Sequence, residues 1–182
     1  MRMDVGSILP QAWRPTATGT LVYVTAGTRV LLIHKRRGHG AGKVNAPGGH
    51  VEVGESPVAC ARRETLEEVC VRCGPLQLGA VLRFHDVAGG GDMLAYAYTA
   101  AAFTGEPAET AEAIPFWAER EALPFDRMWA ADRLWLPLVL AGQRVDAELV
   151  FAGDRLLDQA VTVVPADSTR WARIRPDGEE TS

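Results

Sequence analysis

The sequence is poor in cysteine, and its few cysteines form no pattern that closes a disulfide or metal site. Only Cys60, Cys70 and Cys73 occur among 182 residues, and such an odd, low number indicates a reducing compartment. Cys70 and Cys73 form a C-x-x-C pair, but a zinc site of this type needs a second pair. We interpret all three as ordinary thiols and expect a cytoplasmic protein.

Long apolar runs and blocks of positive charge are also missing. No segment approaches the roughly 18 apolar residues that span a bilayer, and residues 1–15 contain no sustained apolar stretch of the kind found in a secretory signal. We therefore expect no membrane partner. The net charge is -4 and Lys and Arg are dispersed, which argues against a polynucleotide-binding surface. A single nucleotide is a different case, because a small anion needs only a few local cations and a metal.

The first half of the chain begins with two β-rich runs. Residues 20–25 and 29–34 predict a β-hairpin joined by Ala-Gly-Thr. Residues 36–49 form a glycine-rich loop, in which the backbone can adopt shapes and approach ligands in ways that a Cβ would block.

A helix is predicted from Ser56-Pro57 to about Val69. Serine is a good N-cap, and proline suits the first helical position because its missing N–H has no partner there. Residues that recur at helical spacing define its inner face: Val58, Ala61, Thr65 and Val69.

The second half mixes strands with one more helix. The expected strands cover 76–84, 93–103, 114–117, 148–153 and 160–164. The expected helix covers 126–140 and contains Pro137, which can kink it. This mixture predicts a single-domain α/β (α+β) fold. We expect the domain to cover 19–165, after an N-terminal extension at 1–18 and before a loose polar tail at 166–182.

The first helix carries a cluster of carboxylates. Glu64, Glu67 and Glu68 fall within an arc of about 100° on its surface, where they repel one another. Taken alone, the cluster is typical of a solvated acidic face. Gly48 and Gly49 precede it, however, and leave bare backbone that can approach a ligand.

A divalent cation would neutralise such a cluster. Mg²⁺ takes oxygen ligands, keeps some of its waters and bridges to substrate phosphates, and it polarises phosphorus and acidifies a bound water. Glu55 lies just before the helix, where its carboxylate can hold Arg63 in a bidentate pair.

Residues 49–71, which read GHVEVGESPVACARRETLEEVCV, resemble the Nudix box, G-x5-E-x7-R-E-U-x-E-E-x-G-U, where U is a bulky aliphatic residue. The matching residues are Gly49, Glu55, Arg63, Glu64, Glu67, Glu68 and Val71. Two positions depart: Thr65 replaces an aliphatic residue, and Cys70 replaces the last glycine without removing a metal ligand.

This resemblance implies a Nudix fold, in which a mixed β-sheet is sandwiched between α-helices and the box forms a loop–helix–loop. It implies Mg²⁺, with Mn²⁺ as an alternative, and orienting roles for Glu55 and Arg63. The implied metal ligands are Glu64, Glu67, Glu68 and the carbonyl of Gly48. A more distant glutamate usually completes such a site. Glu112 is the candidate, as metal ligand or water-activating base, and Glu109 is the alternative.

Other segments resemble one Nudix subfamily, the mammalian-type oxidised-purine nucleoside triphosphatases or MutT homologues, over roughly residues 20–164. By this resemblance Trp129 stacks on the base, while Asp132 and Asn45 bind its edges. The resemblance implies further pocket residues: Thr20, Lys35, Gly48, Gly49, Met93 and Trp135.

Two differences from the subfamily bear on specificity. Ala131 stands in place of the first of two adjacent acids, and His39 stands in place of a phenylalanine. We interpret His34, His39, His50 and His85 as structural rather than catalytic, although His39 lies near the expected pocket. The expected activity is the hydrolysis of oxidised purine nucleoside triphosphates such as 8-oxo-dGTP to the monophosphate and pyrophosphate, as in nucleotide-pool sanitation. Ala131 is where this specificity is expected to change.

Two alternatives remain at the level of sequence. The first is a Nudix hydrolase for another diphosphate, such as a nucleotide sugar, a dinucleoside polyphosphate or capped RNA. The second is a non-catalytic nucleotide sensor, although such a sensor has no need of an intact carboxylate set. Nothing in the sequence indicates an oligomeric state.

Overall fold

A computed structural model describes residues 13–176 of the chain. At its centre lies an eight-stranded sheet in the order β10-β9-β5-β6-β1-β2-β3, with β8 paired to β2. The strands of this sheet are β1 (Ala17–Ala26), β2 (Arg29–Lys35), β3 (Val44–Asn45), β5 (Gln77–Asp86), β6 (Met93–Ala100), β8 (Ala113–Glu119), β9 (Val145–Ala152) and β10 (Arg155–Val163). Two short strands, β4 (Arg72–Cys73) and β7 (Phe103–Thr104), form a separate antiparallel pair.

The sheet is mixed, as predicted. Strands β1 and β6 are parallel, as are β5 and β9, and the remaining neighbours are antiparallel. The predicted hairpin of β1 and β2 is confirmed, with Thr25 opposite Val30. The late strands β9 and β10 are longer than predicted and form a hairpin of their own.

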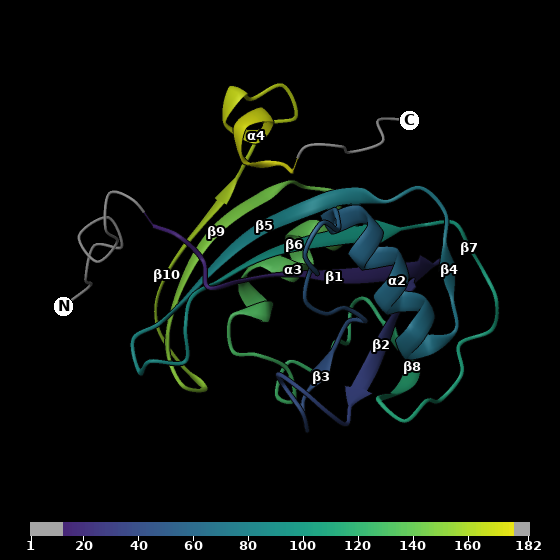
Figure 1. Ribbon diagram of the computed structural model, residues 1–182. Helices are drawn as coiled ribbons and strands as arrows, with labels where there is room; N and C mark the ends of the chain where they lie inside the picture. The colour runs from purple at the N-terminus through teal and green to yellow at the C-terminus, as the bar shows by residue number, and fades with distance from the viewer. Residues whose placement is uncertain (1–12, 177–182) are drawn as a thin grey trace.

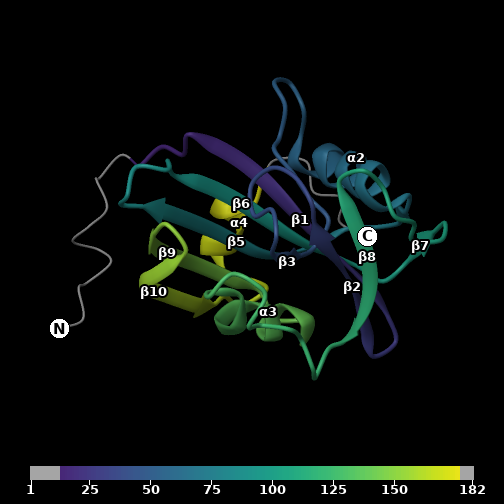
Figure 2. The same cartoon turned by 90° about the horizontal axis from the view of Figure 1, so that it is seen from below.

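Within residues 13–176 the helices are α2 (Pro57–Val69), α3 (Asp132–Leu140) and α4 (Thr169–Ile174). Figures 1 and 2 show α3 on one face, with α2 on the opposite face. The core is accordingly divided into two clusters, one beneath α3 and one beneath α2 and Trp171 of α4. The predicted sandwich of a mixed sheet between helices is confirmed.

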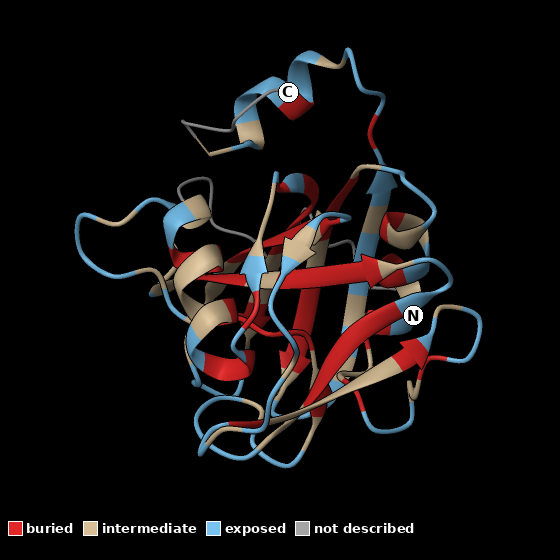
Figure 3. Ribbon diagram, turned by 90° about the vertical axis from the view of Figure 1, so that its right-hand side faces the viewer, coloured by how far each residue is buried: buried red, intermediate tan, exposed pale blue. Residues whose placement is uncertain are grey.

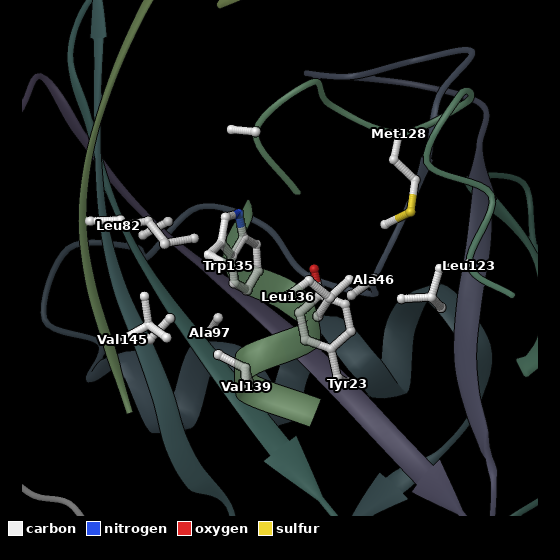
Figure 4. Close-up of a cluster of buried hydrophobic side chains, with 14 of the residues drawn as sticks. Tyr23, Ala46, Leu82, Ala97, Leu123, Met128, Trp135, Leu136, Val139 and Val145 are labelled. Atoms are coloured by element: carbon white, nitrogen blue, oxygen red, sulfur yellow. The ribbon is translucent and has the colours of Figure 1, made fainter. Parts of the chain in front are cut away.

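Helix α3 is held in place by its apolar side. Trp135, Leu136 and Val139 are buried, and Figure 4 shows them among side chains of the sheet such as Leu82 and Tyr23. Figure 3 shows that the central strands are mostly buried, whereas the loops are mostly exposed. Burial of such large side chains stabilises the fold by about 1.5–3 kcal/mol each.

The predicted start of this second helix was wrong. The helix begins at Asp132, because the preceding residues form turns, in which Arg127 N–H donates to the Pro124 carbonyl and Asp132 N–H to the Trp129 carbonyl. Pro137 does lie within the helix, as expected.

The predicted loose tail was also wrong where α4 forms. Ser168 caps this helix by accepting a hydrogen bond from Arg170 N–H at 3.2 Å, and Trp171 is only 3% exposed. Residues 177–182 lie outside the described part, as do residues 1–12 of the expected N-terminal extension. The sheet begins at Ala17, inside that extension. Among residues 13–176, none of the helices is long and apolar enough to cross a bilayer.

The structure accommodates both departures from the Nudix box. The buried Thr65 hydroxyl donates to the Ala61 carbonyl at 2.7 Å, so it is not left without a partner. Cys70 ends α2 with φ 62° and ψ 22°, a left-handed conformation. Among residues 13–176 it is the single non-glycine residue with positive φ, and its Cβ is strained there.

We predict that Cys70→Gly stabilises the protein, because glycine adopts this conformation without steric cost. The expected gain in unfolding free energy is about 1 kcal/mol, measured by urea denaturation. Cys70→Ala is the matched control, since it removes the thiol and keeps the Cβ, and it should give no gain. Equal effects of the two substitutions would show that backbone strain is not the cause.

Candidate active site

Helix α2 is fixed at its start by its predicted cap. The Ser56 hydroxyl accepts a hydrogen bond from Ala59 N–H at 3.2 Å, and Pro57 occupies the first turn. Its inner face is buried at Cys60, Ala61, Thr65, Glu68 and Val69. The inclusion of a glutamate among these buried positions is the first sign of a specialised site.

The loop before α2 lies directly against β1 and α2. A Cβ on Gly48 would lie 1.9 Å from the Thr20 carbonyl oxygen, and one on Gly49 would lie 2.3 Å from the Glu64 carboxylate. Thr20 N–H donates to the Gly49 carbonyl at 2.9 Å. Glycine is therefore required at position 48, where the obstacle is backbone, whereas a side chain at position 49 would displace the Glu64 carboxylate.

Glu68 is a buried carboxylate joined to two other elements. It is 1% exposed; its Oε2 accepts from Gly48 N–H at 2.9 Å and its Oε1 from Lys35 Nζ at 3.1 Å. Burial raises the pKa of Glu68, and the Gly48 N–H and the Lys35 ammonium partly offset that effect. The side chain of Lys35 also donates to the Gly48 carbonyl at 3.3 Å.

Arg63 organises the more exposed carboxylates. Its guanidinium makes the expected bidentate pair with Glu55, at 2.8 and 2.9 Å, and this pair lowers the pKa of Glu55 to about 2. The same guanidinium contacts Glu64 at 2.7 Å and Glu67 at 3.2 Å. One arginine thus holds three carboxylates of the box.

The donor set fits a hard divalent cation. Glu64, Glu67 and Glu68 offer carboxylate oxygens and Gly48 a carbonyl oxygen, the ligand types that Mg²⁺ and Mn²⁺ bind. The Lys35 ammonium already lies within reach of Glu68 and the Gly48 carbonyl, so these oxygens form a cation-binding position. In residues 13–176 no three acidic, histidine or cysteine side chains converge on one point; the carboxylates instead pair with Arg63 and Lys35.

A cavity of about 830 Å³ adjoins these carboxylates. Most of the residues expected in the site line it: Thr20, Lys35, Asn45, Gly48, Gly49, Glu64, Glu68, Met93, Glu112, Trp129 and Asp132. Glu55, Arg63 and Glu67 do not line it; the first two form the supporting pair, and Glu67 is 58% exposed on α2. The structure therefore brings the carboxylates and the expected base-binding residues into one space.

Trp129 and Asp132, the two residues expected to contact a base, both line the cavity. Asp132 is 3% exposed and its Oδ2 accepts from Trp129 N–H at 3.2 Å. Burial raises the pKa of Asp132 to about 7. The imidazole of His39 stacks on Trp129, with ring centroids 5.1 Å apart, and Lys43 Nζ lies 4.7 Å from the same ring.

Two expected pocket residues have other positions or partners. Trp135 is fully buried in the core beneath α3 and does not line the cavity, because it lies on the sheet-facing side of the helix. Asn45 lines the cavity, while its Oδ1 accepts from Ala46 N–H at 2.9 Å. Ala131 is fully buried in the core.

The structure distinguishes the two distal glutamates. Glu112 lines the cavity, and its carbonyl accepts from Arg36 N–H at 2.8 Å. Glu109 is paired with the side chain of Arg36 at 2.5 Å and is 58% exposed. This placement favours Glu112 as the residue that faces the substrate.

Two phenylalanines of the cavity were missed from the sequence. Phe84 of β5 and Phe151 of β9 line it, and the Phe151 ring packs edge-on to Trp129 at 6.2 Å. The alternation of β5 indicates that Phe84 shares a face with Leu82, but the sequence does not indicate that β5 pairs with β9. Arg37, His39 and His50 also line the cavity.

A NUDIX domain model matches residues 13–139 of the sequence. The chain is a member of the Nudix family. Two curated relatives of this Nudix hydrolase are named oxidized purine nucleoside triphosphate hydrolase. The one from Danio rerio is 40% identical over 74% of this chain and 86% of its own length, and the one from Mus musculus is 37% identical over 66% and 78%. A MutT mutator protein from Bacillus halodurans has a similar fold, with a TM-score of 0.71 and 22% identity over 80% of this chain and 97% of its own.

The buried Asp132 predicts a pH-dependent stability. Its pKa is about 7 in the folded protein against an ordinary 3.8, so between these pH values the native state binds more protons than the unfolded state. The free energy of unfolding therefore falls as pH rises through this window, by an amount on the order of a few kcal/mol. We predict that Asp132→Asn removes this decline, as measured by urea denaturation from pH 4 to pH 8.

Asp126→Asn is the matched control, because Asp126 is an exposed carboxylate just before Trp129. The free energy of unfolding of the Asp126→Asn variant should equal that of the wild type at every pH. Parallel curves for wild type and Asp132→Asn would contradict the assignment of the decline to Asp132.

Proposed function

We propose that this Nudix hydrolase converts purine nucleoside triphosphates to the monophosphate and pyrophosphate, with oxidised purines such as 8-oxo-dGTP preferred. The observation that carries the proposal is the single cavity lined both by Trp129 and Asp132 and by Glu64 and Glu68. The names of the relatives from Danio rerio and Mus musculus support the choice of substrate.

We assign the metal-binding role to the acidic side of α2. Glu64, Glu67, Glu68 and the Gly48 carbonyl would hold Mg²⁺, with Mn²⁺ as a substitute. When bound, such an ion polarises the phosphorus centre and lowers the pKa of a coordinated water. Arg63 keeps the carboxylates of the box close together by pairing with three of them.

The remaining chemistry belongs to residues of the cavity. In this scheme the Glu112 carboxylate accepts the proton of the attacking water, or completes the set of metal ligands. The water oxygen bonds to a phosphorus atom next to the oxygen that bridges the α and β phosphates. The bond from that phosphorus to the bridging oxygen breaks, and the monophosphate and pyrophosphate separate. Lys35 neutralises charge that develops on the phosphate oxygens, and Arg37, which also lines the cavity, would supply a second positive charge.

Recognition of the base rests on Trp129 and one carboxyl. A pKa of about 7 means that Asp132 is present both protonated and ionised at neutral pH, so it can donate to a base oxygen or accept from a base N–H. Ala131 supplies no second carboxyl, and Asn45 offers a further polar side chain in the cavity lining. We infer that the chain distinguishes oxidised from plain guanine through Asp132.

The state of the cysteines bears on the cellular compartment of the protein. The cysteines Cys60, Cys70 and Cys73 are free, which supports a reducing compartment. We therefore assign the activity to the cytoplasm and to free nucleotides rather than polynucleotides.

A product assay over a nucleotide panel with Mg²⁺ tests this function. Wild type should release pyrophosphate and monophosphate from 8-oxo-dGTP, with kcat/KM above that for dGTP. Glu67→Gln should lower kcat by at least about a hundredfold, because it removes a metal-binding carboxylate. Glu109→Gln, which alters an exposed carboxylate outside the cavity, should keep full activity.

Each alternative gives a different result in this assay. Equal kcat/KM for 8-oxo-dGTP and dGTP would contradict the preference for oxidised bases. Cleavage of nucleotide sugars or dinucleoside polyphosphates in place of triphosphates would identify another Nudix substrate. Binding without turnover in both wild type and Glu67→Gln would identify a nucleotide sensor.

Trp129 provides a separate prediction about binding. Loss of base stacking costs about 1–3 kcal/mol, so Trp129→Ala should raise KM by roughly 5- to 150-fold with little change in kcat. Trp129→Phe keeps an aromatic face and should restore most of the affinity. A large fall in kcat at unchanged KM would show that Trp129 acts on the reaction centre instead.

A further inference from the structure

A second hollow, of about 310 Å³, lies at the other end of helix α3. The first residue of α3, Asp132, lines the substrate cavity, whereas its last residues, Val139 and Leu140, line this hollow. Among residues 13–176, none lines both spaces. The full set of lining residues is Thr25, Pro75, Gln77, Thr99, Ala101, Ala102, Arg120, Val139, Leu140 and Gly142.

Arg120 gives the hollow its charge. Its Nε is buried and has no hydrogen-bond partner among the described residues, although its backbone N–H donates to the Thr28 carbonyl at 2.9 Å. No acidic side chain is present in the described lining of the hollow. Because a guanidinium is always charged and carries only donors, a buried, unpaired Nε–H beside a hollow indicates a place for an acceptor.

The rest of the lining restricts what can enter. Val139 is 3% exposed, and with Leu140 and Pro75 it gives an apolar wall. Thr25, Thr99 and Gln77 add short polar groups at the strand ends. The volume lies near the lower limit for ligand pockets and is less than half that of the substrate cavity.

From these features we propose that this hollow binds a small organic anion with one acidic group and a compact apolar body. The acidic group pairs with the guanidinium of Arg120, and the apolar body packs against Val139 and Leu140. A nucleoside triphosphate has several phosphates and a polar sugar, and it matches neither the size nor the single cation of this site. The site is thus distinct from the proposed nucleotide site.

Benzoate and benzyl alcohol form a suitable pair of probes, because they have similar shape and differ in charge. Calorimetric titration of the full chain should show tighter binding of benzoate than of benzyl alcohol. Arg120→Gln should weaken benzoate binding by about tenfold or more, the usual effect of losing a charged hydrogen bond, and leave benzyl alcohol unchanged. Arg155→Gln, which alters an exposed arginine on β10, is the matched control and should bind both probes like the wild type.

A second measurement needs no variant. In the wild type, benzoate should shift the NMR amide signals of Thr99 and Gly142 and leave those of Thr20 and Met93 in place, even with deoxyguanosine monophosphate present. The proposal is overturned if benzoate shifts Thr20 and Met93 instead, if the monophosphate displaces it, or if Arg120→Gln binds benzoate as tightly as the wild type. None of these outcomes depends on nucleotide turnover, so the two proposals fail independently.

Discussion

The buried carboxylate of Glu68 is the interaction on which the active site depends. An ionised carboxylate with 1% exposure is stable only when its charge is compensated, and here Gly48 N–H and Lys35 compensate it. These partners come from the glycine-rich loop and from β2, so one side chain joins three elements. Removing a single partner of such a buried pair typically costs about 3–5 kcal/mol.

Residues around Glu68 make room for the loop and balance the other carboxylates of α2. The Thr20 backbone occupies the space that a Cβ on Gly48 would need, and the Glu64 carboxylate lies where a Cβ on Gly49 would be. Arg63 then balances the outer carboxylates, so that repulsion along α2 is met by a single guanidinium. The carboxylates of the Nudix box are therefore balanced by two cationic side chains, Arg63 and Lys35. The Lys35 ammonium lies between oxygens of Glu68 and Gly48, where a cation can bind.

Helix α3 positions Asp132 in the cavity lining. The buried side of this helix, with Trp135, Leu136 and Val139, anchors it to the sheet. Asp132 is consequently fixed in an environment that raises its pKa to about 7. The same position therefore carries both the cost of burying a carboxyl and the role in base recognition that we propose for Asp132.

Local chemistry explains which features could be read from the sequence. The Ser56-Pro57 start of α2, the alternation of the strands and the spacing of the box each depend on neighbours within a few residues, and the structure has them all. The burial of Trp135 and the packing of Trp171 from α4 depend on contacts between distant segments. The start of α3 depends on local turns that the apolar periodicity of residues 126–140 did not reveal. Phe151 reaches the cavity only because β9 pairs in parallel with β5, a pairing that no local signal specifies.

The central claim is that Glu68 and its neighbours hold a divalent cation. Its most direct test is Mn²⁺ binding, followed by the relaxation of water protons, in wild type, Glu68→Gln and the exposed control Glu106→Gln. We predict that Glu68→Gln weakens Mn²⁺ binding by at least about tenfold while the protein stays folded, and that Glu106→Gln matches the wild type. Unchanged Mn²⁺ affinity in folded Glu68→Gln would contradict this account.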